Sequence, residues 1–235
     1  MIERLSPTRR YALLALGFVL LEILMMAFID RPLSVYLRGV DAQYPALIDF
    51  FRAWTDLGLS CWYLWPTGIG AVVCFALSEW RQIPTARRDK LRRASWMLAF
   101  VFVCVALSGI ITDAIKPIVG RARPVLLDRD GFYGFHPLNH HAAYNSFPSG
   151  HTATAFALAF ALIALFPRAR KWLIAFAVAI GLSRIMVNAH YLADVPAGAA
   201  VGVLTVLGVQ RLFRRWGRSG KKHGIFPIDT RPTRR

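Results

Sequence analysis

Six apolar stretches alternate with short polar segments along the chain. A helix crosses a bilayer with about 20 mostly apolar residues, and the first three stretches have that length. The other three are shorter and need residues from their flanks. The six stretches are Tyr11–Ile29, Ser60–Ser78, Ala94–Ile115, Thr152–Phe166, Trp172–Val187 and Val195–Leu212. This pattern predicts an all-α fold, a bundle of six transmembrane helices.

The segment between the first two stretches, residues 32–58, has a different pattern. Its apolar and aromatic side chains recur at roughly helical spacing, as in Leu33, Tyr36, Leu37 and Val40, which is typical of an amphipathic helix. Such a segment can lie in the outer membrane interface with its aromatic residues at headgroup depth. It can equally form a cap over the helix bundle.

Composition agrees with a membrane protein. Hydrophobic residues make up 56% of the 235 residues, against about 45–50% in ordinary soluble domains. No linker or internal repeat divides the chain, so we expect one domain over residues 1–215. The basic remainder, residues 216–235, is expected to contact anionic lipid on the cytoplasmic side or to be disordered.

The net charge of +16 reflects membrane topology rather than nucleic-acid binding. Six successive spans would place every second connecting segment on the same side of the membrane. Of the 29 Lys and Arg residues, 21 would then lie on one side and 8 on the other. Cytoplasmic loops carry the excess of Lys and Arg. We therefore expect a multi-pass protein of the bacterial inner membrane with both termini in the cytoplasm.

The opposite, outward side carries the candidate chemistry. Cations follow the third stretch and end the fifth, a histidine begins the fourth, and a His–Asp pair precedes the sixth. These residues are Lys116, Arg123, His151, Arg184, His190 and Asp194. Ionisable groups this close to a bilayer are costly and usually functional. Three separate helix ends thus predict one site facing the periplasm or the cell exterior.

The residue types at this site predict phosphoryl chemistry. Lys and Arg bind phosphate, and Ser149 and Gly150 precede a helix N-terminus, where backbone N–H groups favour an anion. His190 and Asp194 are four residues apart, so the carboxylate can orient the imidazole and leave one ring nitrogen as a nucleophile. His151 can then act as the general acid for a leaving alkoxide.

Three blocks of residues resemble the signature of the type 2 phosphatidic acid phosphatase superfamily. They are Lys116-x6-Arg123-Pro124, Pro148-Ser149-Gly150-His151 and Ser183-Arg184-x5-His190-x3-Asp194. The resemblance implies a metal-independent lipid phosphatase without cofactors that forms a phosphohistidine intermediate. It makes His190 the nucleophile, Asp194 its orienting partner and His151 the acid. Lys116, Arg123, Arg184, Ser149 and Gly150 would hold the phosphate. Soluble vanadate haloperoxidases share this signature but need no six-span bundle.

Substrate and some neighbouring residues stay open at this level. The resemblance allows phosphatidylglycerophosphate, phosphatidic acid or lipid A 1-phosphate. It disfavours undecaprenyl pyrophosphate, because many enzymes of that type carry Asp where Gly150 stands. A lipid phosphotransferase and a non-catalytic transporter of anionic lipid are the alternatives. Arg121 is either a phosphate contact or a solvated charge. The cluster His136, His140 and His141 is expected to be a polar loop, with headgroup recognition as the alternative.

Overall fold

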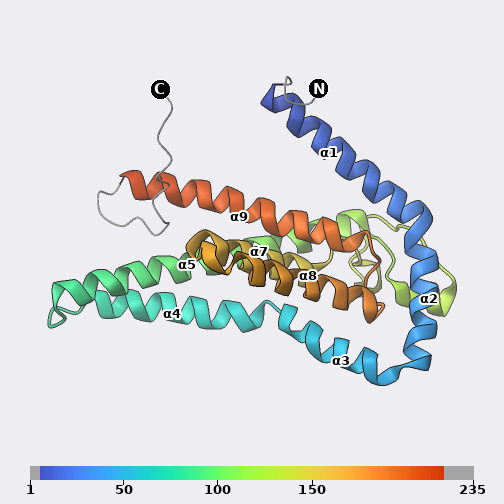
Figure 1. Ribbon diagram of the computed structural model, residues 1–235, viewed down its shortest axis with the longest axis horizontal. Helices are drawn as coiled ribbons and strands as arrows, with labels where there is room; N and C mark the ends of the chain where they lie inside the picture. The colour runs from blue at the N-terminus through green and yellow to red at the C-terminus, as the bar shows by residue number, and fades with distance from the viewer. Residues whose placement is uncertain (1–5, 220–235) are drawn as a thin grey trace.

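The computed structural model describes residues 6–219 and is all-helical in that range (Figure 1). Each apolar stretch of the sequence forms helical structure, apart from one terminal residue in three of them. The helices are α1 (Pro7–Leu24), α2 (Asp30–Gln43), α3 (Pro45–Thr55), α4 (Cys61–Glu79), α5 (Thr85–Val119), α6 (Pro124–Asp130), α7 (Gly150–Leu165), α8 (Arg170–Met186) and α9 (Asp194–Ser219).

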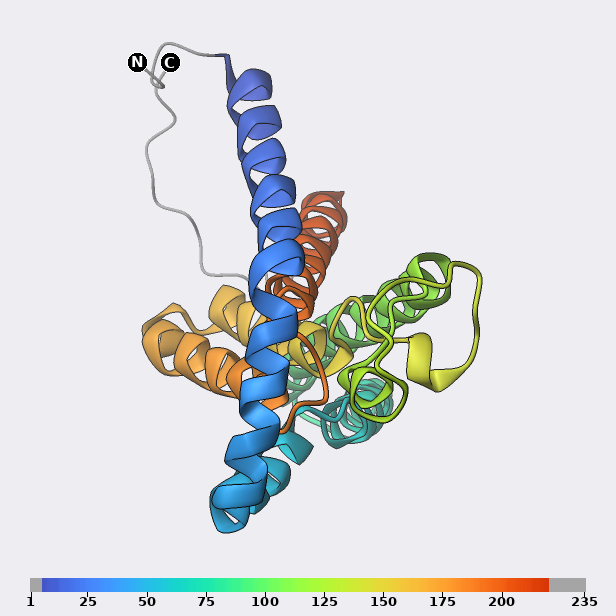
Figure 2. The same cartoon turned by 90° about the vertical axis from the view of Figure 1, so that its right-hand side faces the viewer.

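The first apolar stretch forms α1 and then a π-helical turn over Met25–Ile29, which joins α1 to α2 without a break. Figure 1 shows α1 slanting away from the other helices, while α2 runs across one end of the bundle. Figure 2 looks toward that end and shows α2 lying in front of it. The amphipathic segment is thus a pair of helices, α2 and α3, and α2 caps the bundle.

Helices α5, α7 and α9 pack around an apolar core that contains Phe100, Cys104, Ala157 and Val206. Small residues let α7 and α9 approach closely. A Cβ atom at Gly202 of α9 would lie 2.5 Å from the carbonyl oxygen of Ala153 on α7. The dense contact between these two helices fixes how their ends meet.

Four helical segments of the described chain are long and apolar enough to cross a membrane. They are Thr8–Gln43, Pro45–Glu79, Thr85–Val119 and Asp194–Arg215, and Gly150–Leu165 is a shorter apolar helix. Helix α5 begins nine residues before its expected apolar stretch, because hydropathy does not register helical turns that continue beyond the lipid. Helix α9 runs to Ser219, past the expected domain end at residue 215. The rest of the expected tail, residues 220–235, lies outside the described residues.

The loops that carry the candidate site meet at the end crossed by α2 (Figure 1). Gly120 ends α5 with φ +60°, a left-handed conformation that glycine adopts without strain. A Cβ atom there would lie 1.9 Å from the carbonyl oxygen of His136. Glycine at this position therefore lets the long loop after α5 fold back against its own start.

Candidate active site

The structure brings the three sequence blocks together through α7 and α9. Ser149, the N-cap residue of α7, donates its backbone N–H to the carbonyl oxygen of Asp194 over 2.9 Å. A Cβ atom at Gly198 would lie 2.4 Å from the Ser149 carbonyl oxygen. The start of α7 and the start of α9 are therefore held side by side, with His151 on one and Asp194 on the other.

His190 and Asp194 form the expected pair. Nδ1 of His190 lies 3.3 Å from Oδ2 of Asp194, and both side chains are buried. The contact through Nδ1 leaves Nε2 as the ring nitrogen that can face a substrate. Burial lowers the pKa of His190 to about 4, although the hydrogen bond and charge of Asp194 act in the opposite direction. The imidazole is therefore neutral at pH 7, as a nucleophile must be.

Asp194 is held by more groups than the sequence predicts. Its Oδ1 accepts a hydrogen bond from Arg121 Nη1 over 2.5 Å. Its Oδ2 accepts from the Ser146 hydroxyl over 2.5 Å and from the backbone N–H of Tyr191 over 2.9 Å. These bonds fix the carboxylate that contacts His190.

Arg121 proves to be neither a phosphate contact nor a solvated charge. Its side chain is 1% exposed, and Nη2 donates to Oδ2 of Asp30 over 2.5 Å. The guanidinium stacks on the Tyr191 ring, 4.6 Å from the ring centroid. Burial alone would lower the pKa of Arg121, but the carboxylates of Asp194 and Asp30 raise it overall. Arg121 is a permanent cation between two buried carboxylates.

Three other cations gather around His151. The charges that act on His151 come from Arg184, Lys116 and Arg123, together with His190 when protonated. Lys116 reaches the start of α7, because a Cβ atom at Gly150 would lie 3.2 Å from Lys116 Nζ. The absence of a side chain at residue 150 therefore leaves this ammonium group room to approach the helix N-terminus.

Lys116 is paired with Asp113, to which its Nζ donates over 2.7 Å, but the two arginines keep unused hydrogen-bonding capacity. Arg184 donates through Nη1 to the Thr55 hydroxyl over 2.9 Å, and Arg123 donates weakly through Nη2 to the Asn145 carbonyl over 3.4 Å. Among the described residues, the Nε atoms of Arg123 and Arg184 are buried without a partner. Burial also lowers the pKa of Arg123, since its charge is poorly compensated. An anion placed here would satisfy both guanidinium groups.

Ser149 and His151 complete the cluster. Ser149 is fully buried, and its hydroxyl accepts a hydrogen bond from Thr152 over 2.9 Å, which leaves its own proton available for a bound oxygen. His151 lies in the first turn of α7. A Cβ atom at Gly58 would be 3.0 Å from the His151 ring, so the turn after α3 packs directly on this side chain.

The histidine-rich loop lies apart from this cluster in its interactions. His136, His140 and His141 are exposed, and His141 is engaged locally, with Nδ1 accepting from the backbone N–H of Ala143 over 3.3 Å. Within residues 6–219, no three His, Cys, Asp or Glu side chains are grouped as a metal would require. His141 is thus held within its own loop, and headgroup recognition by this loop stays a prediction.

Sequence analysis missed several residues that support the site, Ser146 and Tyr191 around Asp194 as well as Asp30 and Thr55, and it left Arg121 undecided. Asp30 lies at the end of the first apolar stretch, and its other oxygen, Oδ1, accepts from the backbone N–H of Ala193 over 3.1 Å. Thr55 ends α3 and holds Arg184. Neither has a motif of its own, and Asp30 is 91 residues from its partner Arg121. A buried acid in an apolar run was the available signal for Asp30.

Comparison with known proteins shows which family the chain belongs to. The model of the PAP2 superfamily matches residues 97–218. The chain is 36% identical over 202 residues to the lipid A 1-phosphatase of Rhizobium etli, covering 84% of this chain and 82% of that protein. It is 35% identical over 201 residues to the lipid A 1-phosphatase of Rhizobium johnstonii, covering 83% and 78%.

A solved structure supports the fold. The crystal structure of Aquifex aeolicus LpxE superposes with a TM-score of 0.53 at 23% identity, over 78% of this chain and 95% of that chain. The matched family model covers all three blocks of the site, and the relatives extend the likeness to most of the chain. The protein thus belongs to the PAP2 superfamily and is a multi-pass integral membrane lipid phosphatase.

Proposed function

We propose that the protein hydrolyses the phosphate at the 1-position of lipid A. This chain is 35–36% identical to two lipid A 1-phosphatases, and the matched region spans more than three quarters of the length of each. Glycine at residue 150, where many undecaprenyl pyrophosphatases carry Asp, is consistent with a monophosphate substrate. A carboxylate so close to Lys116 would compete with the substrate phosphate for the ammonium group.

In the proposed reaction, Nε2 of His190 attacks the phosphorus atom. The bond from phosphorus to the sugar oxygen breaks, and His151 gives a proton to that oxygen. Asp194 stabilises the charge that develops on the His190 ring. A water molecule then attacks the phosphohistidine, with His151 taking the water proton, and releases inorganic phosphate and the original imidazole.

The cations supply the electrostatic stabilisation. Lys116, Arg123 and Arg184 would contact the non-bridging oxygens, with the Ser149 hydroxyl and the Gly150 backbone N–H at the helix N-terminus. The observation that carries this proposal is the pair of buried, unpartnered Nε atoms of Arg123 and Arg184 among the described residues, beside a neutral, oriented histidine. This cation set makes a metal ion unnecessary for the chemistry.

We further propose that six helices span the bacterial inner membrane and that the site faces the periplasm. The shorter helices α7 and α8, with 16 and 17 residues, would cross it with help from their flanks. The 21-to-8 division of Lys and Arg supports this orientation. In a variant lacking the native cysteines, His140→Cys should react with an impermeant thiol reagent in intact spheroplasts, and Gln82→Cys only after lysis. The reverse labelling would contradict the orientation.

The substrate proposal is tested with purified protein in detergent and one lipid at a time. Phosphate release is measured from lipid A 1-phosphate, phosphatidic acid, phosphatidylglycerophosphate and undecaprenyl pyrophosphate, with chelator present. We expect the highest kcat/KM on lipid A, and no activity in the His190→Ala control. Preference for another lipid would contradict the substrate. Turnover that requires an added lipid acceptor would identify a phosphotransferase instead, and loss of activity with the chelator would contradict metal independence.

A further inference from the structure

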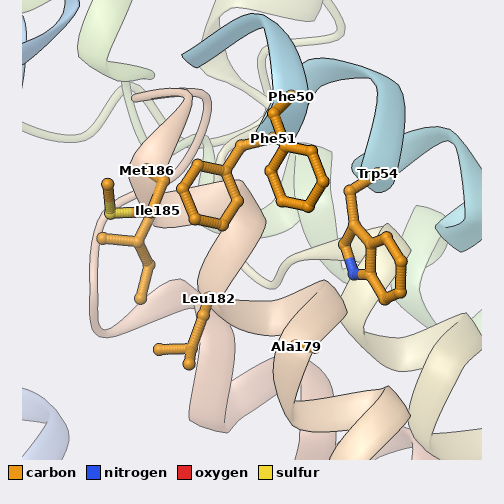
Figure 3. A pocket seen from close by; sticks show the side chains of 7 residues that line it. All are labelled: Phe50, Phe51, Trp54, Ala179, Leu182, Ile185 and Met186. Atoms are coloured by element: carbon orange, nitrogen blue, oxygen red, sulfur yellow. The ribbon is translucent and has the colours of Figure 1, made fainter. Parts of the chain in front are cut away.

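A cleft of about 400 Å³ lies between α3 and α8 and has an almost wholly apolar lining. Figure 3 shows Phe50, Phe51 and Trp54 of α3 facing Ala179, Leu182 and Ile185 of α8. Pockets that bind small ligands begin at about 300 Å³, so the cleft has the size of a binding site. Leu182 is 52% exposed and Phe50 is 59% exposed, so the cleft opens toward the lipid that surrounds the helices.

Both walls of the cleft lead to Arg184, one of the proposed phosphate ligands. Trp54 of the α3 wall is followed by Thr55, whose hydroxyl accepts the hydrogen bond from Arg184. Ile185 of the α8 wall is preceded by Arg184 itself. The contact between Thr55 and Arg184 therefore joins the apolar cleft to the polar site, and a molecule with its phosphate on Arg184 has this cleft beside it.

A second apolar groove provides a comparison. It lies between α4 and α5, has about 540 Å³, and is lined by Trp65, Ile69, Val72, Ala99 and Phe102 among others. Phe102 is 14 residues before Lys116 on the same helix, which corresponds to about 21 Å along its axis. The larger groove is thus remote from the site, whereas the α3–α8 cleft adjoins Arg184.

We propose that the α3–α8 cleft binds the part of an acyl chain that lies nearest the phosphate of the lipid substrate. This proposal rests on the proposed function and adds a chain-binding site to it. The chain would leave the headgroup beside Arg184, pass between Trp54 and Ile185, and continue into the bilayer past Leu182. The cleft thereby distinguishes lipid phosphates from free phosphate and from water-soluble phosphomonoesters.

The test fills the cleft and measures competition. The measured reaction is hydrolysis of nitrophenyl phosphate, which has no acyl chain, in mixed micelles. Dioleoyl phosphatidic acid and inorganic phosphate are added separately as inhibitors, and the inhibition constant of each is determined. Ala179→Trp should raise the inhibition constant of the lipid about tenfold, as expected when about two methylene groups lose their apolar contacts, and leave that of inorganic phosphate unchanged. Ala99→Trp, the same change in the α4–α5 groove, should alter neither constant.

If Ala179→Trp leaves the inhibition constant of the lipid unchanged, the proposal is overturned. The cleft would then contact only the surrounding membrane lipid. An equal rise for lipid and inorganic phosphate would also overturn it, because the damage would then lie in the phosphate site. If the tryptophan variant does not fold, Leu182→Asn places a polar group on the exposed edge of the cleft and should raise the lipid constant about threefold. The measurement requires no turnover of lipid A, so failure of the proposed substrate remains distinguishable.

Discussion

Arg121 and Arg123 stand two residues apart in one loop and have opposite surroundings. Arg121 contacts two carboxylates and an aromatic ring, and is almost completely buried. The side chain of Arg123 makes one long hydrogen bond, to a backbone carbonyl, and its buried Nε has no partner among the described residues. The same type of side chain is thus an internal anchor at residue 121, whereas at residue 123 it keeps donors free for the anion that we propose it binds.

The difference teaches how the site divides its charge. The anchor cluster, which we define as Asp30, Arg121 and Asp194, has two carboxylates on one guanidinium, so its cation is already compensated. The receptor cluster, defined as Lys116, Arg123 and Arg184, has cations in excess. His190 lies between the two clusters. It contacts Asp194, and the charges of Arg184 and Arg123 act to lower its pKa. In the proposed mechanism, the anchor cluster orients the nucleophile and the receptor cluster binds the substrate phosphate.

The largest effect is expected from removing the residue that joins the clusters. His190→Ala should lower kcat by about 10⁵-fold, as loss of a covalent nucleophile does in other enzymes, while the protein elutes as a monodisperse peak in detergent. Asp194→Asn keeps the nucleophile and should lose about 10²-fold or more. Phosphate release under single-turnover conditions measures both. A His190→Ala variant that retained a substantial fraction of the wild-type rate would contradict the assignment.

The two arginines should separate activity from stability. Arg123→Ala removes a hydrogen-bond donor to the proposed phosphate and should lower kcat/KM by about 10²–10³-fold. We expect little change in thermal stability. Arg121→Ala leaves Asp30 and Asp194 as unpaired buried charges and should destabilise the fold by about 3–5 kcal/mol. Kinetics and melting curves in the same detergent measure the two properties. Similar stability losses in both variants would show that Arg123 is also an internal anchor.

A smaller effect is expected at the far end of the anchor cluster. Asp30→Asn keeps the shape of the side chain and an acceptor for the Ala193 N–H, but removes one of the two charges on Arg121. The attraction between Arg121 and Asp194 should then increase. Because Asp194 also contacts His190, the orientation of the imidazole should become less well fixed. We expect kcat to fall about tenfold with KM unchanged, since Asp30 does not reach the phosphate site. The control, Asp128→Asn, removes the exposed ion pair with Arg38 and should alter neither constant.

Much of the fold could be predicted from the sequence, because a membrane helix must satisfy its backbone internally and be apolar along its length. All six apolar stretches are helical. The turn of α2 across the bundle was not predictable, since the π-helical turn at Met25–Ile29 has no sequence signal distinct from the apolar run around it. The amphipathic spacing of residues 32–58 was compatible with both an interfacial segment and a cap.

The candidate site was predictable where chemistry follows local spacing. His190 and Asp194 are four residues apart and do meet, although His190 lies in the turn before α9 and not on a helix as the spacing suggested. Ser149 and His151 flank a helix start. The anchor cluster joins residues from three distant segments, so the sequence around Arg121 does not indicate which residues it contacts. The basic loop presents Arg121 and Arg123 as equivalent charges, and only the fold, by placing Asp30 of α2 over the loop, makes them different.

The smallest effect concerns the proton on His190. Its pKa in the folded protein is about 4, against an ordinary value of 6.5. Between these values the unfolded chain binds a proton that the folded chain does not, so acidification favours unfolding. We expect the melting temperature to fall as pH decreases from about 6.5 toward 4, and the fall to be shallower in His190→Gln, which has no titrating ring. Identical slopes would mean that folding does not lower the pKa of His190, and would contradict the buried, neutral imidazole that the proposed nucleophile requires.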